Sequence, residues 1–270
     1  MALRVLNKRF DGYHDVCSLY WRLVSPETLE VSFGQTDEIS VTGAEIPGEN
    51  ILAAACRHIR KAWGDEALPG ARIKLFKHVP MGSGVGAGSG NAAALMRLCG
   101  RLGRRSDAIS TSAALGADVA FLASEHNLAL AGGVGDVLEG LDGDLSLSAV
   151  IFFPKWASDT ASAYAALDAS RASVGGAMSE SAAHDEAMSV LGALRDGKRV
   201  GLLPNDFMEL APHRPRYDEL RARADDSGAV AWGLCGSGSA FFALYKKPNG
   251  CGDVLNGCKF EWLRQILVLE

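Results

Sequence analysis

The chain has 270 residues, of which 48% are hydrophobic and 22% charged, so it has enough apolar material for one large core or two modest ones and is not a disordered protein. The formal net charge is −5, and no Lys/Arg run is longer than a pair, which argues against nucleic acid as a partner. No apolar run approaches the roughly 18 residues of a membrane span, and the N-terminus lacks the layout of a signal peptide. We therefore expect a cytoplasmic protein that binds neither nucleic acid nor a membrane.

Cysteine and histidine are scattered, whereas glycine is concentrated. The six cysteines form no Cys-x-x-Cys pair and the six histidines show no metal-ligand spacing, so we expect reduced cysteines and no structural zinc site. The 31 glycines gather in a dense run at Gly82–Gly90 and in shorter runs at Gly132–Gly135 and Gly236–Gly238. Such runs indicate places where the backbone comes close to another group.

The first third of the chain predicts strands and one capped helix. Two alternating runs between Leu29 and Thr42, separated by a turn, predict a β-hairpin. Asn50 is expected to cap a helix that ends at Gly64. Residues 72–77 then alternate as a strand does and lead to Pro80 and the glycine run.

Two helices are predicted after the glycine run. Asn91 is expected to cap the first of them. A further helix, starting near Ser106 and ending at Leu115, would place Asp118 just beyond its C-terminal end.

The second half of the chain mixes strands and helices. Residues 147–153 read as a buried strand, the Ala/Ser-rich stretch 157–187 is compatible with helix, and Pro215 fits the first turn of another helix. Residues 229–232 and 240–245 are predicted to be two strands around a tight glycine turn. Because strands and helices do not alternate strictly, an α+β fold is favoured over a doubly wound parallel sheet.

The run from Pro80 to Ala94 has the character of a phosphate-binding loop. Successive glycine N–H groups can converge on an anion, and the N-terminus of the following helix adds positive potential. A Walker A loop is excluded because no lysine lies between Met81 and Arg97. A dinucleotide fingerprint fits only as Gly82-x-Gly84-x-x-Ala87 and lacks its βαβ surroundings, so a nicotinamide enzyme ranks last.

This loop resembles the ATP-binding loop of the galactokinase, homoserine kinase, mevalonate kinase and phosphomevalonate kinase superfamily. Three further segments, Lys8–His14, Leu115–Phe121 and Gly236–Phe242, are similar to motifs of its 4-diphosphocytidyl-2-C-methyl-D-erythritol kinase family, and the sequence Asp-Gly-Tyr-His is the most specific of them. The resemblance implies a two-domain α+β small-molecule kinase fold with the active site in the cleft between the domains. It implies an ATP-binding domain over residues 1–132 and a substrate-binding domain over residues 133–270.

The resemblance also assigns roles to individual residues. Asp118 matches the catalytic base that takes the proton from the substrate hydroxyl. The residues implied to bind ATP are Pro80, Gly82, Gly84, Gly86, Gly88, Ser89, Gly90, Asn91 and Asn50. The residues implied to bind the cytidine-containing substrate or to shape its pocket are Tyr13, His14, Thr160, Tyr164, Gly236, Ser237 and Gly238.

Each assignment has a purely structural alternative. Asp118 alone would be read as a solvated carboxylate at a helix C-terminus, and Asn50 is explained by its role as a helix N-cap. Tyr164 could simply pack a helix, and the turn at Gly236–Gly238 could be an ordinary hairpin turn. Asn205 and Asp206 resemble a structural pair to which we assign no chemistry.

The implied function is ATP-dependent phosphorylation, with Mg²⁺, of the 2-hydroxyl of 4-diphosphocytidyl-2-C-methyl-D-erythritol by a monomer or homodimer. Gly90 replaces a second serine of the family's loop, and the family's N-terminal Pro-Ala-Lys-x-Asn strand has no counterpart after Met1. Two alternatives therefore stay open. One is an ATP-binding protein of the same fold with impaired catalysis, and the other is a superfamily kinase that acts on another small alcohol.

Overall fold

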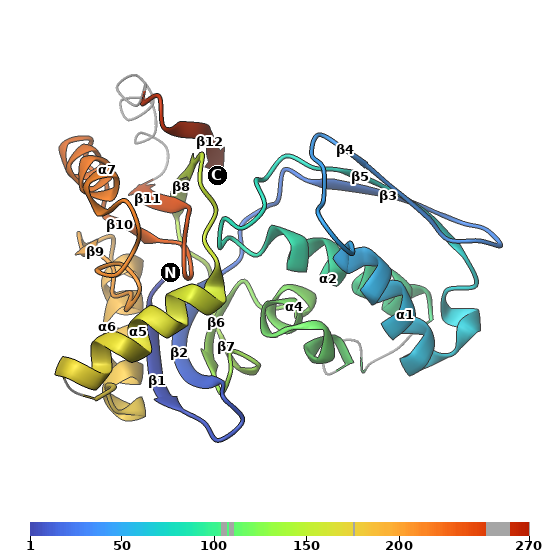
Figure 1. The fold of residues 1–270 in the computed structure, drawn as a ribbon, viewed down its shortest axis with the longest axis horizontal. Helices are drawn as coiled ribbons and strands as arrows, with labels where there is room; N and C mark the ends of the chain where they lie inside the picture. The colour runs from blue at the N-terminus through green and yellow to red at the C-terminus, as the bar shows by residue number, and fades with distance from the viewer. Residues whose placement is uncertain (104–106, 108–110, 175, 247–259, 270) are drawn as a thin grey trace. The chain divides into compact units, whose positions relative to one another are not determined.

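The computed structural model describes residues 1–103, 107, 111–174, 176–246 and 260–269 (Figure 1). Its contacts divide the chain into two compact units. Unit 1 comprises Met1–Val24, Gly82–Val85 and Asn127–Glu270, and unit 2 comprises Ser25–Met81 and Gly86–His126. The division falls inside the glycine run, between Val85 and Gly86. The predicted separation of an ATP-binding part from a substrate-binding part at residue 132 concerns function and stays a prediction.

Unit 2 contains a three-stranded sheet in the order β3-β5-β4. Strand β3 (Thr28–Phe33) is antiparallel to β5 (Ala71–Phe76), and β4 (Glu38–Thr42) is parallel to β5. The predicted hairpin between Leu29 and Thr42 is therefore wrong, because its two strands pair with β5 and not with each other. Strand β5 has a fully buried apolar face, whereas the inward residues of β3 and β4 are half-buried, so β5 takes the central place.

Helices cover the apolar face of this sheet, as Figure 1 shows for α1 (Ile51–Trp63), α2 (Ala87–Leu102) and α4 (Ala117–Ala123). Short 3₁₀ turns lie at Asp65–Ala67 and Ala113–Leu115. The predicted start and stop of α1 at Asn50 and Gly64 are confirmed. The helix predicted from Ser106 lies largely outside the described residues.

Two positions in unit 2 differ from the sequence expectation. Helix α2 begins after Gly86, so Asn91 lies inside the helix and does not cap it. Asp118 lies in the first turn of α4 and not at a helix C-terminus. In both cases the helix starts directly after a glycine with a positive φ, which is +70° at Gly86 and +143° at Gly116.

Unit 1 contains a four-stranded antiparallel sheet and a five-stranded sheet. The first has the order β1-β2-β6-β7 and carries α6 against β2. Its elements are β1 (Leu3–Lys8), β2 (His14–Trp21), β6 (Leu128–Gly132), β7 (Val137–Leu141) and α6 (Glu180–Arg195).

The five-stranded sheet of unit 1 has the order β12-β8-β11-β10-β9, and residues of α5 and α7 pack into its core. Its elements are β8 (Leu147–Pro154), β9 (Gly201–Leu202), β10 (Ala231–Leu234), β11 (Phe241–Lys246), β12 (Leu263–Leu269), α5 (Thr160–Val174) and α7 (Arg214–Asp226). The predicted buried strand, the helix at Pro215 and the pair β10–β11 are confirmed. The Ala/Ser-rich stretch divides into α5 and α6. Within the part of the chain that the structure describes, no helix is both long and apolar enough to cross a membrane.

Candidate active site

The glycine run adopts a backbone that only glycine takes without strain. Gly82, Gly84 and Gly86 have φ of +66°, +77° and +70°, and the residues between them do not have positive φ. This alternation turns the chain repeatedly before helix α2 begins at Ala87. A side chain at any of the three positions would add strain of about 1 to 2 kcal/mol, which explains why glycine recurs at every second residue.

Gly82 and Gly84 belong to unit 1, where Gly82 packs against Ala157 and Gly84 packs against the turn between β10 and β11. A Cβ placed on Gly84 would lie 2.2 Å from the carbonyl oxygen of Cys235 and 2.5 Å from that of Gly238. The amide of Ala240 donates to the carbonyl of Ser83 at 2.9 Å. The two glycine segments therefore touch backbone to backbone, which requires glycine at residue 84.

The β10–β11 turn is held from two sides within unit 1. The Nδ2 of Asn205 donates to the carbonyls of Leu234 and Gly236 at 3.1 and 2.9 Å. Ser158 joins the turn to the glycine run, because its amide donates to the carbonyl of Gly82 at 3.0 Å and its hydroxyl to the carbonyl of Ser237 at 2.8 Å. Burial raises the pKa of the neighbouring Cys235 thiol to about 12, so this cysteine stays protonated at neutral pH.

Thr160 also meets this turn, with its Oγ1 3.1 Å from Oγ of Ser237. The structure thus brings together Thr160 and the segment Gly236–Gly238, which the resemblance implied for the substrate, with Gly84, which it implied for ATP. Both hydroxyls are exposed at the start of α5 and on the turn. They are available to a polar ligand while their backbone is fixed by hydrogen bonds.

The second part of the glycine run forms the N-terminus of α2 in unit 2. Gly86 is the N-cap residue and makes no side-chain cap, and no acidic residue lies in the first turn of this helix. A Cβ on Gly88 would come no closer than 4.0 Å to Ile51, and one on Gly90 no closer than 3.9 Å to Leu122. The first-turn N–H groups of Gly88, Ser89 and their neighbours therefore lie in an uncapped helix N-terminus, which suits an anionic group such as a phosphate.

Asp118 lies close to this helix N-terminus. A Cβ placed on Gly86 would be 3.6 Å from Oδ2 of Asp118, and the Asp118 side chain is exposed in the first turn of α4. The positive end of α4 favours the ionised carboxylate. An ionised, accessible carboxylate next to a phosphate-compatible helix end can accept a proton from a hydroxyl group.

A buried ion pair holds the residues on either side of the whole glycine run. The side chain of Glu27 is fully buried; its Oε1 accepts from Nζ of Lys77 at 2.7 Å and from the amide of Val79 at 3.0 Å. Its Oε2 accepts from Nδ2 of Asn91 at 2.6 Å. Glu27 thus joins the residue before Pro80 to the residue after Gly90. Asn91 directs its amide to Glu27, and its predicted contact with ATP stays a prediction.

Asn50 combines a structural role with an unused donor. Its Oδ1 accepts from the amide of Leu52 at 3.0 Å, which confirms the helix cap. Its Nδ2 is buried and has no hydrogen-bond partner among the residues that the structure describes. An unsatisfied buried amide costs about 1 to 3 kcal/mol. A ligand with a hydrogen-bond acceptor, such as the adenine ring of ATP, would remove that cost.

The predicted substrate residues Tyr13 and His14 follow the turn between β1 and β2. Tyr13 is 67% exposed, whereas His14 is 7% exposed at the start of β2. The ring of Tyr164, on α5, lies 5.0 Å from the His14 ring with an interplanar angle of 31°. Tyr164 in turn contacts Phe207 edge to face. The structure therefore joins His14 with Tyr164 in unit 1 and leaves the neighbouring ring of Tyr13 free to stack on a flat ligand.

Comparison with known proteins identifies the family of this chain. The model of the GHMP kinases N terminal domain matches residues 50–138, and that of the GHMP kinases C terminal domain matches residues 173–250. The 4-diphosphocytidyl-2-C-methyl-D-erythritol kinase of Thermotoga maritima is 31% identical over 262 residues, which cover 95% of this chain and 93% of that protein. The chain belongs to the GHMP kinase family.

Other relatives agree with this assignment. The enzyme of the same name from Chlorobaculum tepidum is 31% identical, over 91% of this chain and 86% of that protein. A crystal structure of 4-(cytidine 5'-diphospho)-2C-methyl-D-erythritol kinase matches with a TM-score of 0.78 and 27% identity, covering 99% of this chain and 94% of that one. A homoserine kinase from Cytophaga hutchinsonii shares the fold, with a TM-score of 0.60 at 17% identity and coverage of 98% and 87%. As a GHMP kinase, the chain is a small-molecule phosphotransferase that uses ATP and has a two-domain α+β fold.

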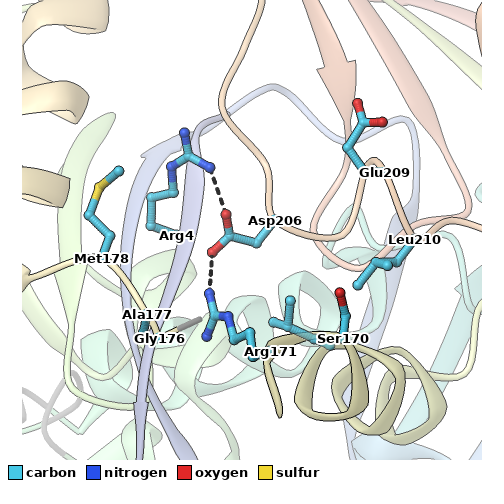
Figure 2. Close-up of a pocket in the computed structure, with 10 residues that line it drawn as sticks. Arg4, Ser170, Arg171, Gly176, Ala177, Met178, Asp206, Glu209 and Leu210 are labelled. Atoms are coloured by element: carbon cyan, nitrogen blue, oxygen red, sulfur yellow. Dashed lines mark hydrogen bonds and ion pairs between the residues drawn. The ribbon is translucent and has the colours of Figure 1, made fainter. Parts of the chain in front are cut away.

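One pocket of this GHMP kinase has a structural explanation. Figure 2 shows Arg4 and Arg171 on either side of Asp206, with ion pairs of 2.6 and 2.8 Å to its two carboxylate oxygens. Arg4 also pairs with Glu186 at 2.6 Å, and Arg171 donates to the carbonyls of β1. The carboxylates of Glu186 and Asp206 raise the pKa of Arg4. Because both guanidinium groups are engaged by these partners, the ion pairs around the pocket link β1, α5 and α6. The structural role that we gave Asn205 and Asp206 is confirmed.

Several polar residues of the kinase were not found from the sequence. Asp168 pairs with His14 and Lys8, and Glu27 pairs with Lys77. A signal for Asp168 existed, because it follows Tyr164 by four residues and so shares its helix face. Among the residues described, His, Cys, Asp and Glu form no group of three that could hold a metal ion.

Proposed function

We propose that the chain transfers the γ-phosphoryl group of ATP to the 2-hydroxyl of 4-diphosphocytidyl-2-C-methyl-D-erythritol, a reaction of non-mevalonate isoprenoid biosynthesis. The observation that carries this proposal is the identity of about 30% along almost the whole chain with kinases of that name. The structural match to a kinase of the same name at 27% identity supports it further. Kinases of other alcohols share the fold at 17% identity or less.

In this proposal, ATP lies along the second part of the glycine run. Its phosphates would accept from the first-turn amides of α2 at Gly88 and Ser89, and its adenine from the unused Nδ2 of Asn50. The amide of Gly90 donates to the carbonyl of Gly86 at 2.8 Å, so Gly90 would contribute by letting the phosphates approach closely. Pro80, Gly82, Gly84, Gly86 and Asn91 would shape this segment. Mg²⁺ would be held mainly by the ATP phosphates.

Asp118 would act as the general base. Its carboxylate takes the proton of the 2-hydroxyl as that oxygen forms a bond to the γ-phosphorus and the bond to the β,γ-bridging oxygen breaks, leaving ADP. The amides of the α2 N-terminus offset the negative charge that remains on the phosphates. The chain thus contributes positioning, charge compensation and one proton acceptor.

The cytidine group would lie against Tyr13, His14 and Tyr164. Tyr13 offers an exposed aromatic face for stacking, and His14 offers a ring nitrogen to the edge of the base. Thr160 and the turn at Gly236–Gly238, with its Ser237 hydroxyl, would accompany the diphosphate and the sugar alcohol. We propose residues 1–132 as the ATP-binding part, which also contributes Tyr13 and His14 to the substrate, and residues 133–270 as the substrate-binding part.

The direct test supplies purified protein with ATP, Mg²⁺ and 4-diphosphocytidyl-2-C-methyl-D-erythritol and measures ADP and the phosphorylated product. We expect one ADP for each product molecule and no turnover of mevalonate or homoserine. Turnover of another alcohol in preference to the cytidine substrate would contradict the proposed substrate. ATP binding in a calorimeter without any product would contradict the proposed catalysis.

Asp118→Asn tests the base. The amide keeps the size of the side chain but cannot accept the proton, so kcat is expected to fall about 10²- to 10⁴-fold while ATP binding is retained. The matched control is Asp65→Asn, an exposed aspartate of the same unit, which is expected to leave kcat unchanged. An Asp118→Asn variant with the parent's kcat would exclude Asp118 as the base.

We also infer a cytoplasmic location and a monomeric or homodimeric state. A soluble metabolite and ATP as substrates support the location. Light scattering on the purified chain measures the state, and a mass above twice the 28.5 kDa of one chain would contradict it.

A further inference from the structure

His14 is part of a three-residue relay that reaches the surface of unit 1. Its Nε2 lies 2.7 Å from Oδ1 of Asp168, and the other carboxylate oxygen of Asp168 lies 2.6 Å from Nζ of Lys8. The His14 side chain is 5% exposed, whereas those of Asp168 and Lys8 are 32% and 54% exposed. The hydrogen bond from Lys8, opposed by desolvation and assisted by His14, lowers the pKa of the Asp168 carboxyl.

An ionised carboxylate fixes where the proton of a neutral imidazole lies. Both oxygens of such a group accept hydrogen bonds and neither donates, so Nε2 of His14 must carry the hydrogen. The other ring nitrogen, Nδ1, is then a bare acceptor. Among the described residues, none makes a hydrogen bond to Nδ1 of His14. Nδ1 is not one of the fully buried atoms without a partner, so it is not completely shielded from solvent.

The two pyrimidines differ in what they offer to such an acceptor. Cytosine carries an amino group at C4, which donates, whereas uracil carries a carbonyl oxygen there, which only accepts. A bare Nδ1 accepts a hydrogen bond from the amino group of cytosine, whereas it is repelled by the carbonyl oxygen of uracil, which is also an acceptor. A site built to complete one hydrogen bond rejects a ligand that leaves its polar atoms unpaired.

We propose that Asp168 and Lys8 are specificity-determining residues that hold His14 in the Nε2–H form, so that its Nδ1 selects cytosine over uracil in the nucleoside diphosphate group of the substrate. This inference rests on the proposed function, which places the base beside His14. Asp168 acts through His14 and is a positioning residue. Lys8 acts through Asp168, because it keeps one carboxylate oxygen engaged and the other directed to the imidazole.

The variant Asp168→Asn gives a result that loss of structure alone would not give. Lys8 can only donate, so it draws the amide oxygen of Asn to itself and turns the amide NH₂ toward His14. Nε2 must then accept, and the hydrogen moves to Nδ1, which now donates and favours the C4 oxygen of uracil. We expect the ratio of CMP to UMP affinity to fall about 10- to 100-fold and the preference to approach or cross unity.

Two measurements follow the relay without catalysis. Calorimetric titration of the full chain with CMP and UMP gives the affinity ratio, and ¹⁵N NMR of the histidine ring distinguishes the Nε2–H from the Nδ1–H form. The parent should show the Nε2–H form and tighter CMP binding, and Asp168→Asn should show the Nδ1–H form. Because neither readout needs the phosphoryl transfer, failure of the proposed reaction and failure of this inference are distinguishable.

Three further variants separate the relay from stability. Lys8→Met combined with Asp168→Asn frees the amide to turn its oxygen to Nε2, so part of the cytosine preference should return. Asp168→Glu keeps the carboxylate and should keep the Nε2–H form. Asp185→Asn removes another carboxylate beside a histidine, the exposed pair with His184, and should leave the CMP to UMP ratio unchanged.

Two results would overturn the inference. One is an Nδ1–H form of His14 in the parent at neutral pH, which can be read even if the Asp168→Asn variant does not fold. The other is a folded Asp168→Asn variant whose CMP to UMP ratio equals that of the parent. With 4-diphosphocytidyl-2-C-methyl-D-erythritol and its uridine analogue, the same change should appear in KM while kcat for the cytidine substrate changes little.

Discussion

The two parts of the glycine run look alike in the sequence and differ in the structure. Gly82 and Gly84 have positive φ, and Gly84 touches the backbone of the β10–β11 turn, so a side chain there would overlap two carbonyl oxygens. Gly88 and Gly90 have ordinary helical backbone in the first turn of α2, with room for a Cβ. The first part therefore has glycine because the fold requires it, whereas the second part has glycine where the fold would accept alanine.

This difference indicates where a ligand belongs. A glycine that the fold does not need is explained by a group outside the chain that approaches the backbone closely. The glycines of the second part lie at an uncapped helix N-terminus, in contrast to α1 and α6, which are capped by Asn50 and Ser179. This difference supports the proposal that the phosphates of ATP lie along Gly88–Gly90, and it indicates a structural role for Gly84.

The largest expected effect concerns the Glu27 anchor, the hydrogen bonds of Glu27 to the residues on either side of the glycine run. Glu27→Gln removes the charge that pairs with the buried Lys77 and weakens the link between Val79 and Asn91. Loss of one partner of a buried ion pair costs about 3 to 5 kcal/mol. Urea unfolding should show this loss, whereas Glu30→Gln, on an exposed position of β3, should change stability by less than about 0.5 kcal/mol. Equal stability of the two variants would show that the anchor is dispensable.

The next largest effect is expected at Gly84, in the first part of the run. Gly84→Ala introduces a methyl group into the contact with Cys235 and Gly238 and places a non-glycine residue at φ +77°. We expect a loss of about 2 to 4 kcal/mol in unfolding free energy. Gly34→Ala is the control, because no atom lies within 4 Å of its Cβ and its φ is not positive. A neutral Gly84→Ala would remove the distinction between the two parts.

Sequence reasoning succeeded where the signal is local. The cap at Asn50, the stop at Gly64 and the alternation in β5 each depend on neighbouring residues, and the structure confirms them. The family motifs correctly identified a GHMP kinase because four segments occur in order along the chain. The start of α2 was predicted incorrectly at Asn91. Glycine and asparagine are both favoured at the N-cap position, and in the structure the left-handed Gly86 occupies it.

Sequence reasoning failed where the partner is distant. Strands β3 and β4 have the sequence pattern of a hairpin, but in the sheet β5 lies between them and pairs with both. Asp168 lies 154 residues from His14, and Asn91 lies 64 residues from Glu27, so the local sequence does not reveal either partner. A local signal exists only for Asp168 itself, which shares a helix face with Tyr164. Single polar residues on a helix face are usually solvated, and their role becomes visible only when the fold brings a second polar group to them.

The smallest expected effect is the sharpest test of the comparison. Gly88→Ala meets no atom closer than 4.0 Å and replaces glycine in a helix, so the free energy of unfolding should rise by about 0.5 to 1 kcal/mol. The added methyl group stands beside the amides proposed to bind the phosphates, so the KM for ATP should rise. Gly192→Ala in α6 has the same open surroundings and should give the same gain in stability with an unchanged KM. If both variants keep the parent's KM, the phosphates do not lie at Gly88. If Gly88→Ala alone raises KM while remaining the more stable protein, its glycine serves the ligand and not the fold.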